Sequence, residues 1–397
     1  MNRIITTSIA LVLIALSAVG AVAAQDPDAS AEPTAGAAQT ADPEVAREVL
    51  SPSGTMTFEE PRWKKITPSR GPAAREDHTW TVDGEGRYAY LFGGRDGGKD
   101  FGDLWRFDLE TDTWKKLTPR GKSPAARFGH SAVWVDGFGV ILFAGQRGAD
   151  FFGDLWVYDP AENKWTELPA RGGAPKARYG SCMVVGPDGR PWISHGFTFA
   201  GRFDDTRAYN LKTKRWACIA PDGRRPDERC LHDCFTSATG ELVLYGGQDN
   251  ANIALGDLWV TRPDRAWRKE PDPKPKARRL YAVTEAGDHA WVFGGADSDN
   301  NPLDDLWRVD RETLEFERVK VTGSSPSARY AGTLITDAKR GRLLLFAGQG
   351  KEAKADVWQL TGRSGPATDD APSDDDVAES SADPASPTSP PATSEDA

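Results

Sequence analysis

Short apolar runs that each end in glycine recur six times along the chain. They read YLFGG, ILFAG, WISHG, VLYGG, WVFGG and LLFAG, and successive closing glycines lie 48 to 53 residues apart. Short apolar runs between turn residues are typical of buried β-strands. A nearly constant period of this length is typical of a repeat architecture. The closing glycines are Gly94, Gly145, Gly196, Gly247, Gly295 and Gly348.

Two further signals accompany every run. A proline precedes it, with an arginine three residues later, and an aspartate follows it and opens another apolar segment, usually Asp-Leu-Trp. An aromatic residue then marks a last segment in most units. Each unit therefore contains four short strands, which we call a, b, c and d in chain order. The arginines before strand a are Arg75, Arg127, Arg178, Arg229, Arg278 and Arg329, and the aspartates are Asp103, Asp154, Asp205, Asp257, Asp305 and Asp356.

Six four-stranded units are the sequence signature of propeller blades. The Pro-x-x-Arg start, the double glycine and the paired aromatic residues resemble the Kelch repeat family over residues 61–362. The resemblance implies an all-β, six-bladed propeller similar to the central domain of galactose oxidase. In such a fold strand a lines the central channel, strand b ends in Gly-Gly, strand c carries Asp-Leu-Trp and strand d is outermost.

A missing strand predicts how the ring closes. The sixth unit stops at DVWQLTG, residues 356–362, and has no strand d. RWKKITP at 62–68 stands alone ahead of the first unit and mirrors TWKKLTP at 113–119. We therefore expect the N-terminal strand to complete the last blade, which also removes exposed strand edges.

The two ends of the chain differ in composition from the repeats. Residues 1–24 combine a basic start, an apolar run and small residues, which predicts a cleaved signal peptide and an exported protein, periplasmic or extracellular. An uncleaved membrane anchor is the alternative, and after cleavage we expect no membrane insertion. Residues 25–60 and 363–397 are polar and rich in Ala, Pro, Ser and Asp, so we expect a disordered linker and a disordered acidic tail.

The net charge of -10 comes from these ends. Residues 25–60 hold eight acids and residues 363–397 hold nine, each against one Arg, which leaves 46 basic and 42 acidic side chains in residues 61–362. Because these basic residues are scattered rather than clustered, we expect no nucleic-acid partner. We expect a monomer.

Residues that recur in every blade are best explained by the fold. An Arg/Asp pair is expected in each blade, with a structural role. Three residues after the arginine the blades differ, with His78, His130 and His232 among the residues present. Because His232 belongs to the opposite side of the ring from the other two, we predict hydrogen-bonded histidines rather than a zinc site.

Four cysteines between residues 182 and 234 fit disulfides in an exported protein, with three possible connectivities. Cys182 lies four residues after its arginine and Cys234 five, so they point to opposite sheet faces and could bridge blades 3 and 4. This pairing leaves Cys218 with Cys230. A metal site within Cys230–Cys234 is the alternative.

The candidate ligand site lies where the blades differ, in the b–c loops and the d–a loops of one face. Aromatic and basic residues there suit sugar rings, carboxylates or an acidic peptide. The alternative for Phe101 is packing beneath its own loop. His195 and Arg207 stand where other blades place a small residue and a tryptophan. The ligand-binding candidates are Arg95, Phe101, Arg147, Phe151, His195, Phe199, Arg202 and Arg207.

These features favour an exported, non-enzymatic recognition or scaffold protein that binds a protein or a glycan. The alternative is a sugar-acting enzyme similar to N-acetylneuraminate epimerase or galactose oxidase, with Glu76 and Asp77 as the nearest acid/base candidates. No cofactor is expected. Asp297, Asp299 and Asn301 resemble the start of a calcium loop, but a proline follows where the turn glycine should stand.

Overall fold

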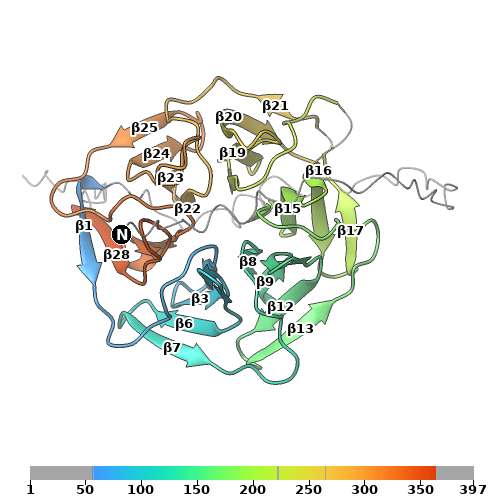
Figure 1. Cartoon of the computed structure of the whole chain (residues 1–397), viewed down its shortest axis with the longest axis horizontal. Coiled ribbons are helices and arrows are strands. Elements are labelled where there is room, and N and C mark those ends of the chain that lie inside the picture. The colour runs from blue at the N-terminus through green and yellow to red at the C-terminus, as the bar shows by residue number, and fades with distance from the viewer. Residues whose placement is uncertain (1–55, 57, 221–222, 264, 364–397) are drawn as a thin grey trace, which may run out of the picture. The chain divides into compact units, whose positions relative to one another are not determined.

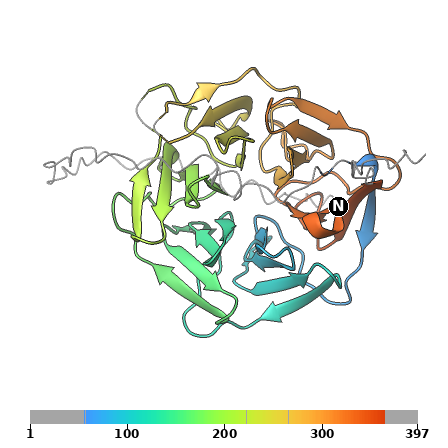
Figure 2. The same ribbon diagram turned by 180° about the vertical axis from the view of Figure 1, so that it is seen from behind.

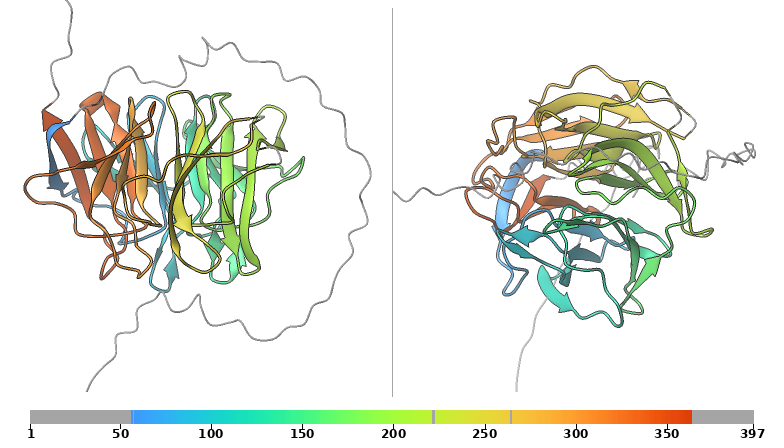
Figure 3. Two further views of the ribbon diagram at one scale, coloured as in Figure 1. Left: turned by 90° about the horizontal axis from the view of Figure 1, so that it is seen from above. Right: turned by 45° about the vertical axis from the view of Figure 1, so that its right-hand side comes forward.

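The described residues contain six four-stranded antiparallel sheets arranged around a central channel (Figures 1 and 2). The computed structural model describes residues 56, 58–220, 223–263 and 265–363. The side view shows strands running roughly along the channel axis (Figure 3). The all-β, six-bladed fold is therefore confirmed. The predicted signal peptide, nearly all of the predicted linker and the acidic tail beyond Arg363 lie outside the described residues.

Each blade contains strands a to d in the predicted order. Two blades add short strand pairs in the b–c loop, β4 (Arg95–Asp96) with β5 (Lys99–Asp100) and β10 (Gln146–Arg147) with β11 (Asp150–Phe151). No helix in the described ranges is long and apolar enough to span a membrane. The blades are β2 (Thr79–Val82), β3 (Tyr88–Phe92), β6 (Leu104–Asp108) and β7 (Thr113–Leu117); β8 (Ser131–Val135), β9 (Gly139–Phe143), β12 (Leu155–Asp159) and β13 (Lys164–Leu168); β14 (Cys182–Val185), β15 (Pro191–Thr198), β16 (Gly201–Asn210) and β17 (Arg215–Cys218); β18 (Asp233–Thr236), β19 (Leu242–Gln248), β20 (Ala254–Thr261) and β21 (Arg268–Lys269); β22 (Ala282–Ala286), β23 (His289–Phe293), β24 (Leu306–Asp310) and β25 (Phe316–Val319); and β26 (Thr333–Asp337), β27 (Arg342–Phe346), β28 (Val357–Arg363) and β1 (Glu59–Ile66).

The N-terminal strand closes the ring as predicted. β1 pairs antiparallel with β28, with Trp63 opposite Leu360. β1 begins at Glu59, inside the segment expected to be linker, and β28 runs on to Arg363. Trp63 is buried and its ring lies 5.6 Å from that of Phe293 in blade 5. The closing strand is thus held by backbone pairing and by a buried side chain.

A buried arginine ties strands b and c together in every blade. In blade 2, Arg127 donates from Nη1 and Nη2 to the two carboxylate oxygens of Asp154, at 2.6 and 2.9 Å, and from Nη1 to the carbonyl of Ala144. Trp156 Nε1 donates to the same carboxylate. Burial would raise the pKa of Asp154, but the hydrogen bonds and charge of Arg127 hold it below its usual value. The predicted Arg/Asp pairs are present in all six blades, with the arginines almost fully buried.

A closed cycle of backbone hydrogen bonds surrounds the channel. One residue at the start of each blade donates its N–H to the equivalent residue of the previous blade and accepts from the next, over 2.7 to 3.0 Å. All six have positive φ, between 53° and 64°. A side chain on Gly129 would collide with the ring of Tyr179, so the close approach requires glycine there. The cycle is made by Asp77, Gly129, Gly180, Leu231, Leu280 and Ala331.

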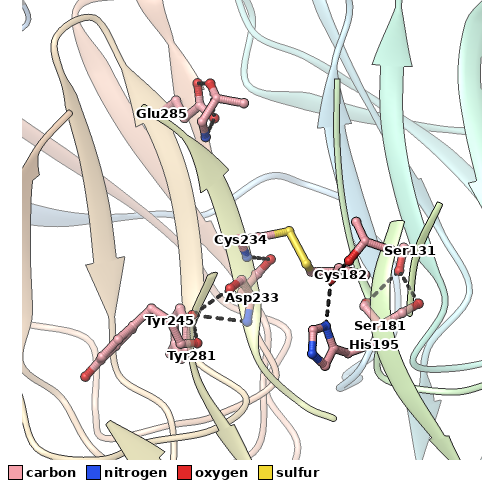
Figure 4. Close-up of a disulfide and its surroundings, with 12 residues drawn as sticks. Ser131, Ser181, Cys182, His195, Asp233, Cys234, Tyr245, Tyr281 and Glu285 are labelled. Carbon is pink, nitrogen blue, oxygen red and sulfur yellow. Dashed lines mark hydrogen bonds between the residues drawn. A yellow bond between two sulfur atoms is a disulfide. The ribbon is translucent and has the colours of Figure 1, made fainter. Parts of the chain in front are cut away.

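A disulfide joins the inner strands of blades 3 and 4 (Figure 4). It links Cys182 of β14 to Cys234 of β18, with Cα atoms 5.8 Å apart, and matches the predicted bridge. The second predicted pairing is wrong, because Cys218 and Cys230 are free thiols. Cys218 ends the outermost strand β17 and is exposed, whereas Cys230 is buried just before an inner strand. Cys234 is occupied by the disulfide, which removes it from the alternative metal site.

Trp63→Ala tests the closure. Truncating this buried tryptophan should cost about 3–5 kcal/mol in the free energy of unfolding, because it opens a cavity under the closing strand. The adjacent exposed Lys64→Ala is the matched control and should stay within about 0.5 kcal/mol of wild type. Denaturant titration measures both, and equal small effects would show that β1 does not hold the ring.

Thiol mapping tests the cysteine assignment. Mass spectrometry of the unreduced protein should find one disulfide, between Cys182 and Cys234. Cys218 should react with an alkylating reagent in the folded protein, and Cys230 only after unfolding, because burial blocks access. A Cys218–Cys230 crosslink, or four free thiols in freshly purified protein, would contradict the structure.

Candidate functional site

The residues that border the channel where the inner strands begin differ from blade to blade. In every blade the residue after the buried arginine pairs, as an isolated antiparallel bridge, with the residue after the closing glycine of the strand b run. We call these twelve positions the channel mouth. One member of each pair lies three residues before the inner strand and the other follows the closing glycine, so the repeated framework places them alike. They are Glu76 with Arg95, Phe128 with Gln146, Tyr179 with Phe197, Cys230 with Gln248, Arg279 with Ala296, and Tyr330 with Gln349.

An acidic pair marks the blade 1 side of the mouth. Arg95 donates from Nε to Glu76 at 3.0 Å, and its Nη2 lies 3.2 Å from Asp77. The Tyr179 hydroxyl donates to Asp77 at 3.1 Å. Burial, and then the charge of Asp77, raise the pKa of Glu76 to about 7 against the pull of Arg95. Arg95, a predicted candidate, therefore lies at the mouth and is held by two carboxylates.

Two arginines and a thiol mark the opposite side. Arg202 donates from Nη2 to Asn252 Oδ1 at 2.8 Å and from Nε to Cys230 Sγ at 3.2 Å. Arg279 donates from Nη1 to the backbone carbonyl of Asn252 at 3.3 Å, and it also contacts Asn300 Oδ1. Burial raises the pKa of the Cys230 thiol. Arg202 was predicted as a ligand residue; Arg279 and Cys230 were not.

Aromatic rings cluster beside Arg202. The centroids of Phe151 and Phe199 lie 4.9 Å apart, and Phe197 lies 6.0 Å from Phe151. Phe199 is 57% exposed. The guanidinium of Arg202 lies 5.3 Å from the ring centroid of Phe197. The structure thus brings together Phe151, Phe199 and Arg202 on the loops of blades 2 and 3, as the sequence predicted.

Phe101 belongs to the framework of its own blade. It packs beneath the guanidinium of Arg75, which lies 4.2 Å from its ring centroid. Phe152 and Phe203 take the same position under the arginines of the next blades. The prediction that Phe101 binds ligand is therefore wrong, because this repeated phenylalanine covers the buried arginine of its own blade.

His195 is structural. It is fully buried between blades 3 and 4, 6.0 Å from the ring of Trp267, and its Nδ1 contacts Ser194 Oγ at 2.6 Å. Its assignment as a ligand residue is therefore wrong. Arg207 donates from Nε to Asp205, as tryptophan Nε1 does to the equivalent aspartate in the other blades. Its side chain is 30% exposed, so its assignment as a ligand residue stays a prediction.

The remaining candidates lie at loop tips. Arg147 is half exposed and lies 3.7 Å from Asp150 of its own hairpin. The carboxylate of Asp297 accepts hydrogen bonds from the backbone N–H groups of Asp299 and Asn301. Asp249 in blade 4 accepts the same pair of bonds in its own turn. The spacing that resembled a calcium loop is thus accounted for by a turn that two blades share.

His78, His130 and His232, which directly precede inner strands, lie at separate blade interfaces. Each packs against strand b of the preceding blade, with ring centroids 5.3 to 5.5 Å from Phe346, Phe92 and His195. His130 Nε2 contacts Thr79 Oγ1 at 2.8 Å. His78 has no hydrogen-bond partner for its ring nitrogens among the described residues, so the hydrogen-bonding expectation is wrong for His78.

Below the mouth, the channel holds a cavity of about 230 Å³ lined by the first residues of the six inner strands. Asp233 and Tyr281 are part of its wall (Figure 4). Burial raises the pKa of Asp233 to about 7. The Tyr281 hydroxyl donates to the carbonyl of Tyr245 at 2.7 Å, so it ties blade 5 to blade 4. The Asp233 carboxylate, by contrast, accepts from the backbone N–H of Cys234 in its own strand.

A constant framework with a variable channel mouth defines the protein as a six-bladed β-propeller of the repeat type. The chain belongs to the Kelch-repeat family. The family described as the KLHDC2/KLHL20/DRC7 Kelch-repeats domain matches residues 47–247 and 222–365.

Curated relatives carry the same repeats. Kelch domain-containing protein 3 of Bos taurus is 30% identical over 267 residues, 59% of this chain and 66% of the relative. Kelch domain-containing protein 10 of Homo sapiens is 24% identical over 282 residues, 65% of this chain and 63% of the relative. Leucine-zipper-like transcriptional regulator 1 of Pongo abelii is 28% identical over 294 residues, 70% of this chain and 34% of the relative. The chain thus spans less than two thirds of the length of these relatives.

Glu76→Gln tests the buried carboxylate. Because the folded protein holds the Glu76 proton more tightly than the unfolded chain, whose pKa is near 4.5, this group's contribution to stability falls as pH rises through about 7. The melting temperature of the variant relative to wild type should therefore rise between about pH 5 and pH 8. The exposed Ser69→Ala, which removes no titratable group, should show a constant difference. A flat profile for Glu76→Gln would contradict the assignment.

Proposed function

We propose that this protein is a non-enzymatic recognition module that binds another protein through the channel-mouth face of its propeller. One observation carries the proposal: the buried arginine, its aspartate and the glycines repeat in all blades, while the residues that directly follow them at the mouth differ. A binding scaffold is expected to combine a constant framework with variable residues at its binding face, here the channel mouth. The Kelch-domain relatives support the same class of function.

The exposed apolar residues of this face support a protein partner. Phe199 is 57% exposed on the β15–β16 hairpin, and Ile253 is 53% exposed on the neighbouring β19–β20 hairpin. Exposed aromatic anchors beside arginine are typical of the residues that dominate protein interfaces. The rings of Phe151, Phe197 and Phe199 meet edge to face rather than as one flat platform, which favours a protein side chain over a stacked sugar ring.

We place this function outside the cytoplasm. The disulfide between Cys182 and Cys234 supports this location, because such bonds persist in oxidising compartments.

Alanine substitution of the aromatic cluster tests the proposal. The double variant Phe151→Ala/Phe199→Ala should lose most of its capture of crosslinked partners from the exported fraction, by about tenfold or more, because anchors of this kind carry about 2 kcal/mol or more each. Phe138→Ala is the matched control: Phe138 is 40% exposed in the β8–β9 turn, at the other end of the strands. The control should bind like wild type.

A glycan array run in parallel separates the alternatives. Equal capture by the double variant and the Phe138 control would overturn the aromatic anchor. Glycan binding that depends on Phe199, without any protein crosslink, would replace the protein partner by a carbohydrate.

A further inference from the structure

Buried arginines in the described part of the chain have carboxylate partners, with an exception at the channel mouth. The six framework arginines bind aspartates, Arg311 lies 2.9 Å from Glu285, and Arg342 binds Asp112 and Asp337. Arg279 is 6% exposed, yet its hydrogen bonds go to the Asn252 carbonyl and the Asn300 amide. A buried guanidinium served only by neutral oxygens is electrostatically uncompensated.

A second guanidinium with neutral partners lies beside the first. Arg202 donates to Asn250 Oδ1, to Asn252 Oδ1 and to the Cys230 thiol. Asn252 joins the two arginines, since its side-chain oxygen accepts from Arg202 and its backbone oxygen from Arg279. Cys230 adds no charge, because burial favours its neutral form. The pair therefore places two positive charges around one asparagine.

Two neighbouring carboxylates are engaged elsewhere. Asp297 of blade 5 accepts two backbone N–H groups and the Asn301 amide of its own turn. Glu228 accepts a hydrogen bond from Asn250 at 2.7 Å. Both acids lower the local potential without pairing with either guanidinium. Burial lowers the pKa of Arg279, and the charge of Asp297 acts against this shift.

The donors suit an oxyanion. A guanidinium has five N–H groups in a planar fork, and the two hydrogen bonds of Arg279 leave three of them for another acceptor. Two guanidiniums close together match the two oxygens of a carboxylate. Apolar surface flanks them, because Ile253 follows Asn252 directly and the Phe197 ring lies beside Arg202.

We propose that Arg202 and Arg279 form an anion site that takes a side-chain carboxylate of a protein partner, while the apolar residue next to that carboxylate packs against Phe199 or Ile253. This inference rests on the proposed binding function and adds the chemistry of the partner. The channel mouth therefore recognises a partner segment in which an acidic residue stands beside an apolar one. The acidic pair of blade 1, on the far side, disfavours a partner that is acidic along its whole length.

Labelled peptides of known sequence test the site. The probes are Gly-Ser-Glu-Leu-Glu-Ser-Gly and its counterpart with Gln for both Glu, and binding is followed by fluorescence anisotropy. Wild type should prefer the Glu peptide by at least about tenfold, and the preference should weaken with salt, as expected of charge pairing. The preference should vanish in Arg202→Gln/Arg279→Gln. It should survive in Arg268→Gln, which alters an exposed arginine of the outermost strand β21.

Stability gives a second readout that does not need a ligand. Arg278 and Arg279 are adjacent, but Arg278 binds Asp305 and Arg279 has no carboxylate. Arg278→Gln should lower the melting temperature, because it leaves Asp305 without its cationic partner. Arg279→Gln should leave the melting temperature unchanged or raise it. A fall in melting temperature for Arg279→Gln as large as that for Arg278→Gln would show a framework role and overturn the site.

The remaining outcomes separate this inference from the proposed function. If wild type binds both peptides equally while loss of Phe199 still abolishes partner capture, the anion site is overturned and the recognition function stands. If labelled oligogalacturonate binds through Arg202 and Arg279 and the Glu peptide does not, the carboxylate belongs to a glycan and the protein partner is overturned. A Glu preference that survives in the double arginine variant would place the anion site elsewhere.

Discussion

The bidentate pair between a buried arginine and the aspartate of strand c is the contact on which the rest of the propeller depends. In blade 3, the side chain of Arg178 joins Asp205 to the carbonyl of His195 at the end of strand b. Its backbone accepts from Gly145 and donates to Phe152, both in blade 2. One residue thus fixes the sheet within its blade and the docking of that blade on its neighbour. The buried ion pair is tolerated because its guanidinium and its carboxylate are both hydrogen-bonded.

This arrangement also explains where variation is possible. The framework uses the side chain of the repeated arginine, so the residue after it is held in place while its own side chain is free to vary. Arg278 and Arg279 illustrate the division, since the first is paired with Asp305 and the second borders the mouth with neutral partners. A rigid neighbour positions a variable side chain accurately, as a recognition surface requires.

The repeats made the architecture predictable, whereas single side chains depended on loop geometry. Six copies of one pattern fixed the blade count and the closing strand, and the alternation of side chains along strand a placed Cys182 opposite Cys234. Alternation could not place Phe101, because its loop turns back under Arg75. The sequence pattern did not single out Arg279 as a site residue, because it directly follows the repeated Arg278. Aligning the six repeats and comparing the position after that arginine would have revealed it.

Side chains fasten several blade interfaces in addition to the common framework, among them a disulfide and two buried arginines. Blades 3 and 4 share the disulfide, Arg311 of blade 5 donates to the carbonyl of Thr236 in blade 4, and Arg342 of blade 6 binds Asp112 of blade 1. Each of these fastenings resists separation of adjacent blades. A surface that changes little on binding avoids the entropy of ordering its loops. The free energy of each mouth contact is then available for discriminating between partners, because little of it is needed to build the site.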